Sequence, residues 1–188
     1  MQKPEINVVV FSGGSAPNSE HIALAEQLGL ELAKNNIGII NGGGGGLMEH
    51  VAKSAHGAGG HVIGVHFEFE GQGKSKYNSK TISFSVLQDR QKKILELGEL
   101  YVALPGGLGT LYEVIDVMSL KYVGTIPGER KLVLLGKKYW GNFESLIDSM
   151  VSSGYAKSKI KDLYQTVDTV GELLSVIRAG NSTKNVGS

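Results

Sequence analysis

The sequence contains no cysteine among its 188 residues. This absence excludes disulfide bonds, thiolate metal sites and a cysteine nucleophile. Charge of one sign is not in excess either, because 19 Lys and Arg against 18 Asp and Glu leave a formal net charge of +1. A chain balanced in this way offers no electrostatic reason to expect binding to nucleic acid or to a membrane surface.

Long apolar runs are also lacking, so no segment is expected to span a bilayer, and no signal peptide is indicated. We therefore expect a cytoplasmic protein. The length and the 41% hydrophobic content suit one domain with a packed core. We assign residues 1–179 to this domain and expect residues 180–188 to form a disordered tail.

Two familiar nucleotide motifs are missing. No stretch reads G-x-G-x-x-G, and Tyr112 stands where the third glycine after Gly107 and Gly109 would be. Gly73-Lys74-Ser75 imitates the end of the phosphate loop of nucleotide triphosphatases, but Glu68 occupies the place of its first glycine. These absences argue against ordinary NAD use and against ATP hydrolysis. The five histidines show no ligand spacing, so no metal site is predicted.

Glycine, in contrast, is abundant, with 27 residues that gather in clusters. Three clusters, at 12–15, 42–46 and 105–109, directly follow apolar runs that indicate strands. Strands are expected over 6–11, 38–40, 61–67, 81–86, 100–104, 131–135 and 164–167. Helices are expected over 19–35, 47–52, 87–97 and 142–151, and from 110 and 169 onward.

Strands that alternate with helices predict a doubly wound, Rossmann-like α/β fold, with a parallel sheet and helices on both faces. In such folds the ligand binds beyond the carboxyl ends of the strands. The three glycine clusters should therefore open on one edge of the sheet. For the helix over 87–97, the pattern predicts inward Leu87, Ile94 and Leu97 and largely solvated Arg90, Lys92 and Lys93.

The most informative stretch is LPGGLGTLYEVIDVM, residues 104–118. A strand that passes through glycines into a helix leaves unpaired N–H groups at the helix start, and these suit a phosphate. Glu113 lies about one turn inside, close enough to act on a ligand held there. Two alternatives stay open: the glycines are merely tight turns, and Glu113 is an exposed partner of the helix dipole. The expected inner face comprises Leu111, Val114, Ile115 and Met118.

Residues 105–113 fit the pattern PGGxGTxxE, and here the sequence resembles the LOG ("lonely guy") family, often labelled lysine decarboxylase. Three further stretches agree with that family in order and spacing: VVVFSGGS at 8–15, NGGGGGLMEHVAKSA at 41–55 followed by GGHVIGV, and DRQKK at 89–93. The resemblance covers about residues 6–155 and implies the fold already expected from the pattern.

The resemblance implies a phosphoribohydrolase, which cleaves the N-glycosidic bond of a purine nucleoside 5′-monophosphate. AMP or a cytokinin riboside 5′-monophosphate would yield free base and ribose 5-phosphate. Arg90 and Glu113 would be catalytic. No metal or organic cofactor is implied, and a homodimer is, with the helices near 90 and 113 close to the contact. The implied substrate-binding residues are Gly13, Ser15, Gly43, Gly44, Gly106, Gly107, Gly109, Thr110 and Asp116.

The chain departs from the family pattern around Arg90, where Leu87, Gln88 and Gln91 replace the usual Met, His and Lys. After the third strand, Glu68 or Glu70 would have to substitute for a base-contacting glutamate. These differences leave the identity of the base open. Two rivals remain, a non-catalytic carrier of a nucleotide or molybdenum cofactor and a nucleotide sensor, and both would need the phosphate cradle but no Arg–Glu pair.

Overall fold

A computed structural model describes residues 4–68 and 73–184. The expected strands all form, each with bounds within two residues of those predicted. The strands are β1 (Ile6–Phe11), β2 (Ile37–Asn41), β3 (Val62–Phe67), β4 (Lys80–Phe84), β5 (Leu100–Ala103), β6 (Leu132–Leu135) and β7 (Gln165–Val167). The helices are α1 (Ser19–Lys34), α2 (Leu47–Gly57), α3 (Leu87–Leu97), α4 (Leu108–Tyr122), α5 (Lys137–Ser152) and α6 (Val170–Lys184), with a 3-10 helix, η1 (Ser158–Leu163).

The strands form one parallel sheet in the order β4-β3-β2-β1-β5-β6-β7, so the predicted doubly wound α/β fold is confirmed. The chain builds outward from β1 to β4, then crosses back and continues from β5 on the other side of β1. The order therefore reverses between β1 and β5, where such folds bind ligands. The loops after these two strands touch, since Gly13 N–H donates to Pro105 O at 3.3 Å.

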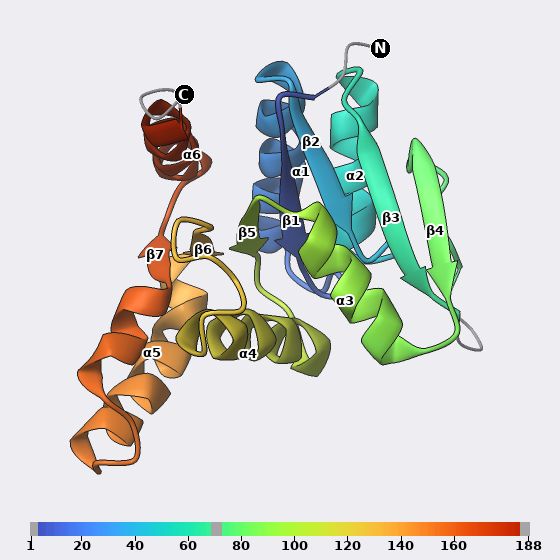
Figure 1. The fold of residues 1–188 in the computed structure, drawn as a ribbon. Helices are drawn as coiled ribbons and strands as arrows, with labels where there is room; N and C mark the ends of the chain where they lie inside the picture. The colour runs from blue at the N-terminus through green and yellow to red at the C-terminus, as the bar shows by residue number, and fades with distance from the viewer. Residues whose placement is uncertain (1–3, 69–72, 185–188) are drawn as a thin grey trace.

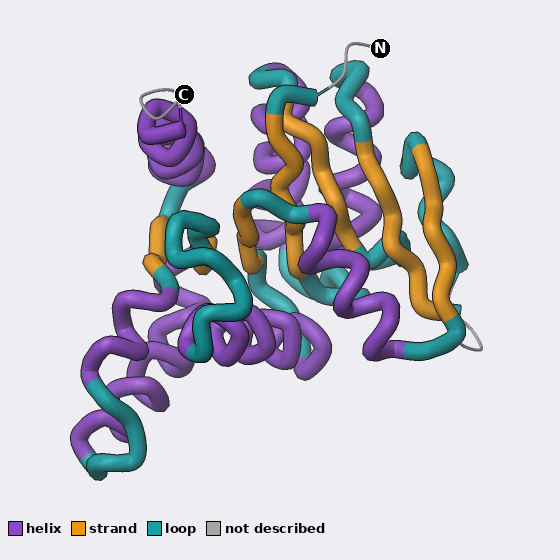
Figure 2. The backbone as a smooth tube through the Cα atoms, viewed as in Figure 1, coloured by secondary structure: helices purple, strands orange, loops and turns teal. Residues whose placement is uncertain are grey.

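Helices cover both faces of this sheet (Figures 1 and 2). Side chains alternate along β1, so Val8 and Val10 join the core under α1, α2 and α6. Val9 and Phe11 join the opposite core, under α3, α4 and α5. Both cores consist largely of fully buried aliphatic side chains, which suits strands that are covered on both sides. This packing holds the carboxyl ends of β1 and β5 rigidly in the middle of the sheet.

Helix boundaries show where local sequence is informative. Asn18 caps α1 as predicted, because its Oδ1 accepts hydrogen bonds from the N–H groups of Glu20 and His21. Helix α5 was predicted to start at Asn142, which was wrong. The helix begins at Lys137, after Gly136 in the left-handed region (φ 102°), and it thereby buries Trp140. The 3-10 helix η1 had no counterpart in the sequence prediction.

The C-terminal segment starts later than the sequence suggested. Helix α6 continues through residue 180 to Lys184, and residues 185–188 lie outside the described part of the chain. Among residues 4–68 and 73–184, no helix combines the length and apolar character needed to cross a bilayer.

Two predicted helix faces need correction. Leu87 and Ile115 were expected inward but are 41% and 39% exposed. Conversely, Arg90 was expected to be largely solvated, whereas its side chain is only 12% exposed. The reason is that α3 and α4 bury polar side chains against each other as well as apolar ones against the sheet. Their inner faces instead include Gln91, Ile94 and Leu95 on α3, and Thr110, Glu113, Val114, Val117 and Met118 on α4.

Candidate active site

A cavity of about 490 Å³ opens beyond the carboxyl ends of β1 and β5. Its floor is the first glycine turn, and one wall is the start of α4. The apolar side chains of Met48, Phe67 and Leu87 close another side. The lining residues are Val10, Phe11, Ser12, Gly13, Gly14, Ser15, Gly42, Met48, Phe67, Leu87, Arg90, Gly107, Gly109, Thr110 and Glu113.

The start of α4 offers backbone donors to this cavity. Gly107 is the N-cap residue, and no side chain supplies a capping hydrogen bond. The first N–H groups of a helix carry no intrahelical partner, and the helix dipole makes this end favourable for an anion. Gly107 and Gly109 have no protein atom within 4 Å of where a Cβ would lie, so the backbone faces open space here. This end of α4 can therefore receive a phosphate group.

Arg90 and Glu113 meet at the side of the cavity. Arg90 Nη1 donates to Glu113 Oε1 at 2.7 Å, and Arg90 Nε donates to Val65 O at 3.0 Å. The arginine therefore joins three elements, α3, α4 and β3. The side chains are 12% and 10% exposed, so the ion pair is shielded from bulk water on most sides. Such a pair keeps its charge only because each partner satisfies the other.

The second glycine turn makes room for this arginine. A Cβ on Gly42 would lie 2.5 Å from Arg90 Nη2 and 2.6 Å from Met48 Sδ. Neither the guanidinium group nor the thioether could keep its position beside any larger residue. Asn41 shapes the same turn, because its Oδ1 accepts the N–H of Gly43 at 2.8 Å. The glycines at 42–46 thus serve the site by letting Arg90 approach.

Burial raises the pKa of the Glu113 carboxyl above its ordinary value of 4.5. The charge of Arg90 and its hydrogen bond lower this pKa in opposition, and the charge of Asp116 raises it further. Among the described residues lining the cavity, Arg90 and Glu113 are the ionisable ones. The site thus combines an anion-binding helix end, a cation and a nearly dry carboxylate, which suits a reaction that develops positive charge on a bound sugar phosphate.

The structure sorts the predicted binding residues. Gly13, Ser15, Gly107, Gly109 and Thr110 line the cavity. Gly106 lies directly beneath it, packed on Thr110 and Gly13. The remaining predicted glycines, Gly43 and Gly44, are not among the lining residues.

Asp116 lies apart from the cavity that holds Glu113. Its Oδ2 accepts from Gln91 Nε2 at 3.0 Å, and it lines a separate cavity. A step of three residues turns a helix about 60° short of a full turn, so Asp116 points to the neighbouring side of α4. Glu68 is not among the lining residues either, and its Oε1 accepts from Lys74 Nζ at 3.3 Å. Glu70 lies outside the described residues.

Sequence reasoning missed Ser12 and the apolar residues of the cavity. Ser12 is 6% exposed, and its Oγ has no hydrogen-bond partner within the described structure. Its position directly after β1, at the predicted ligand edge, was a usable signal. Met48, Phe67 and Leu87 carried no such signal, because apolar residues at element ends normally suggest core. Within residues 4–68 and 73–184, no three or more His, Asp or Glu residues gather as a candidate metal site.

Two neighbouring glycines separate folding from ligand binding. In Gly106→Ala, the new Cβ would lie 2.1 Å from Thr110 Oγ1 and 2.9 Å from Gly13 N. We expect it to reduce the free energy of unfolding by about 1–3 kcal/mol. In Gly109→Ala the methyl group meets no protein atom within 4 Å. Stability should then hold or rise slightly, while binding of a phosphate-bearing ligand weakens. Denaturant unfolding and calorimetric titration measure both; equal destabilisation by the two variants would contradict this placement.

Comparison with known proteins identifies the relatives of this site. A family model described as "Possible lysine decarboxylase" matches residues 48–177. The cytokinin riboside 5′-monophosphate phosphoribohydrolase LOG4 of Arabidopsis thaliana is 30% identical over 93% of this chain and 83% of its own length. The chain belongs to the LOG family. A probable phosphoribohydrolase of the same name type, LOGL2 of Oryza sativa subsp. japonica, is 31% identical over 89% of this chain and 70% of its own length.

Solved structures share the fold. The X-ray structure of TM1055 superimposes with a TM-score of 0.71 at 25% identity, and covers 93% of this chain and 99% of that one. The Moco carrier protein of Chlamydomonas reinhardtii gives a TM-score of 0.70 at 23% identity, with coverage of 97% and 99%. At that identity the second likeness concerns the fold alone. The LOG fold is therefore shared by proteins whose names denote an enzyme and a carrier.

Proposed function

We propose that this LOG-family protein hydrolyses the N-glycosidic bond of a purine nucleoside 5′-monophosphate, of the cytokinin type or AMP. The products are the free base and ribose 5-phosphate. One observation carries the proposal: the buried Arg90–Glu113 pair, joined at 2.7 Å, lies within one turn of a helix start that lacks a side-chain cap. The names of the relatives support it.

The geometry supports a simple course of reaction. The 5′-phosphate accepts hydrogen bonds from the N–H groups at the start of α4, which places the ribose toward Glu113. As the C–N bond breaks, positive charge develops on the ribose, and the Glu113 carboxylate stabilises that charge or orients the attacking water. Water supplies the hydroxyl group on the anomeric carbon and, in the balance, the proton on the base. Arg90 holds Glu113 ionised and presents its remaining N–H groups to the nucleotide.

A decarboxylase finds no support at this site. A pyridoxal enzyme needs a lysine amine to hold the cofactor. Among the described residues that line the cavity, none is a lysine.

The direct test is incubation with AMP and, separately, with isopentenyladenosine 5′-monophosphate, followed by chromatography of the released base. We expect release from at least one nucleotide. Adenosine is the matched control, and its cleavage should be slower by about 10- to 100-fold because phosphate binding no longer contributes to the transition state. Recovery of tightly bound but intact nucleotide would contradict hydrolysis and indicate a carrier or a sensor.

We also propose that the chain forms a homodimer through the outer face of α4. Exposed apolar residues recur there at helical spacing, and Leu108 and Val123 are 82% and 70% exposed. Contiguous apolar surface of this kind is typical of a protein contact. The other members of this stripe are Tyr112, Ile115 and Tyr122.

A further inference from the structure

A second polar pair joins α3 to α4 beside the ion pair of the site. Gln91 follows Arg90 directly on α3, and Asp116 lies three residues after Glu113 on α4. Gln91 Nε2 donates to Asp116 Oδ2 at 3.0 Å. The two contacts therefore run side by side along the same pair of helices, one containing the cation and one containing a neutral amide.

The glutamine is unusually well buried for a polar side chain, at 3% exposure. Its Oε1 has no hydrogen-bond partner within the described residues. The orientation of the amide is not arbitrary, because a carboxylate can only accept and so must face the NH₂ group. Burying an amide with one end unsatisfied costs free energy. The bond to Asp116 is what holds the side chain in this position.

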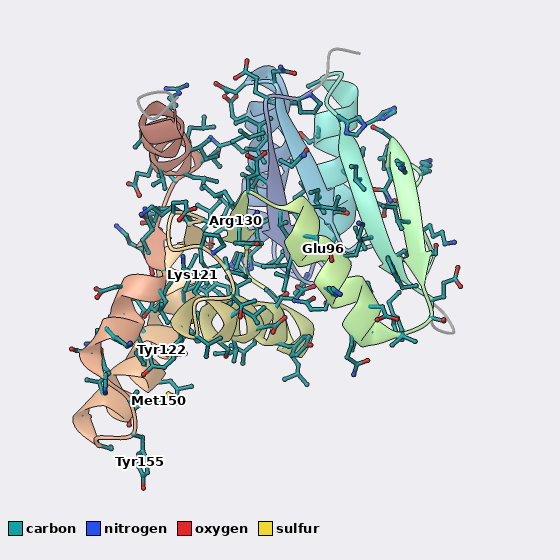
Figure 3. All side chains as sticks on the ribbon, viewed as in Figure 1. Glu96, Lys121, Tyr122, Arg130, Met150 and Tyr155 are labelled. Atoms are coloured by element: carbon teal, nitrogen blue, oxygen red, sulfur yellow. The ribbon has the colours of Figure 1, made fainter. Side chains whose placement is uncertain are left out.

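The pair lies at the boundary between two cavities. Arg90 and Glu113 line the candidate active site, while Gln91 and Asp116 line a second cavity of about 490 Å³ between α3, α4 and the loop before β6. The charged groups that share this second cavity with Asp116 are Lys92 and Glu96 from α3 and Arg130 from the loop. Figure 3 labels Glu96 on α3 and Arg130 beside it. Any shift of Gln91 along α3 would move its neighbour Arg90 with it.

We propose that Gln91 and Asp116 are positioning residues: their hydrogen bond holds α3 against α4 so that Arg90 stays in register with Glu113. This inference rests on the proposed hydrolysis. An ion pair of 2.7 Å tolerates little displacement. Misplacement of a catalytic group by about 1 Å can reduce a rate by about 100-fold. Asp116 has an additional effect, since its negative charge raises the pKa of Glu113.

The first test replaces the amide by an apolar group of similar size. Gln91→Leu should lower kcat by about 10- to 100-fold while KM stays within about threefold, because the phosphate cradle lies on other loops. Gln88→Leu is the matched control. It makes the same chemical change on the same helix beside the same cavity, at an exposed position, and should leave both constants unchanged.

Two further variants separate positioning from a general loss of structure. Gln91→Lys retains a donor to Asp116, so kcat should stay within about threefold of the wild type. Asp116→Asn keeps an acceptor but removes a charge that raises the pKa of Glu113. That pKa should fall, and the acid limb of kcat/KM should move to lower pH. A purely structural contact would not move the pH profile.

Titration of the Glu113 carboxyl carbon by ¹³C NMR gives a readout that does not depend on catalysis. It should shift to lower pH in Asp116→Asn and stay unchanged in Gln88→Leu. If the wild type released no base from any nucleotide, the proposed hydrolysis would fail, and this titration would still decide whether Asp116 acts on Glu113. The inference is overturned if Gln91→Leu keeps the kcat of Gln88→Leu, if Gln91→Lys is as impaired as Gln91→Leu, or if the Glu113 titration is the same in Asp116→Asn and the wild type.

Discussion

Replacing Glu113 by glutamine is expected to reduce base release by about 10²- to 10³-fold, with nucleotide binding largely retained. The substitution keeps the shape and leaves an oxygen that can accept from Arg90 Nη1, so the arginine stays near its place. It removes the negative charge that would stabilise the ribose as the glycosidic bond breaks. The loss should therefore appear in kcat, because the charge matters only as the transition state develops.

Single-turnover rates and calorimetric titration with AMP measure the two parts of this result. Glu96→Gln is the matched control, since Glu96 lies on α3, is solvent-accessible and pairs with Lys93 at 3.2 Å. Full activity in Glu113→Gln would exclude the proposed role of this carboxylate.

The wild-type pH profile should carry the signature of the same group. Burial raises the pKa of Glu113 above 4.5, and the reaction needs the ionised form. As the pH falls through this raised pKa, the carboxylate takes up a proton and activity is lost. The acid limb of kcat/KM should therefore have its midpoint above 4.5 and be absent in Glu113→Gln.

The second large effect is expected for Arg90→Ala, with a loss of about 10²- to 10³-fold in kcat/KM. Removing the guanidinium takes away the partner of a buried carboxylate. An unpaired buried charge is costly, so Glu113 will instead hold a proton over a wider pH range. Both influences of Arg90 lower the pKa of Glu113, and their removal raises it. The acid limb should thus move to higher pH.

Arg90→Lys serves as the graded variant. A lysine has one charged nitrogen, whereas Arg90 donates from Nε to Val65 O and from Nη1 to Glu113 at the same time. We expect an intermediate loss because the single ammonium group cannot reproduce this fork. Lys93→Ala on the same helix is the surface control. A pH profile of Arg90→Ala that matches the wild type would contradict the coupling between the two residues.

Much of the fold was accessible from sequence because its signals are local. Apolar runs that end at glycine clusters marked β1, β2 and β5, and Asn18 marked the start of α1. The start of α5 was missed because Gly136 in a left-handed conformation, rather than a capping side chain, begins the helix. Asn142 has the chemistry of a cap but lies inside the helix, where Trp140 packs into the core. Packing decided the boundary there.

The candidate site divides along the same line. The strand, glycine turn and helix over residues 100–122 follow from the sequence alone, and with them the anion-binding end of α4, because each step depends on residues a few positions apart. The contact between Arg90 and Glu113 joins residues 23 positions apart and exists only because β3, α3 and α4 pack together. The same packing turned Asp116 away from the cavity and buried Gln91. Which side chains are dry and which partners they meet depends on neighbours distant in sequence, so the tertiary structure alone decided them.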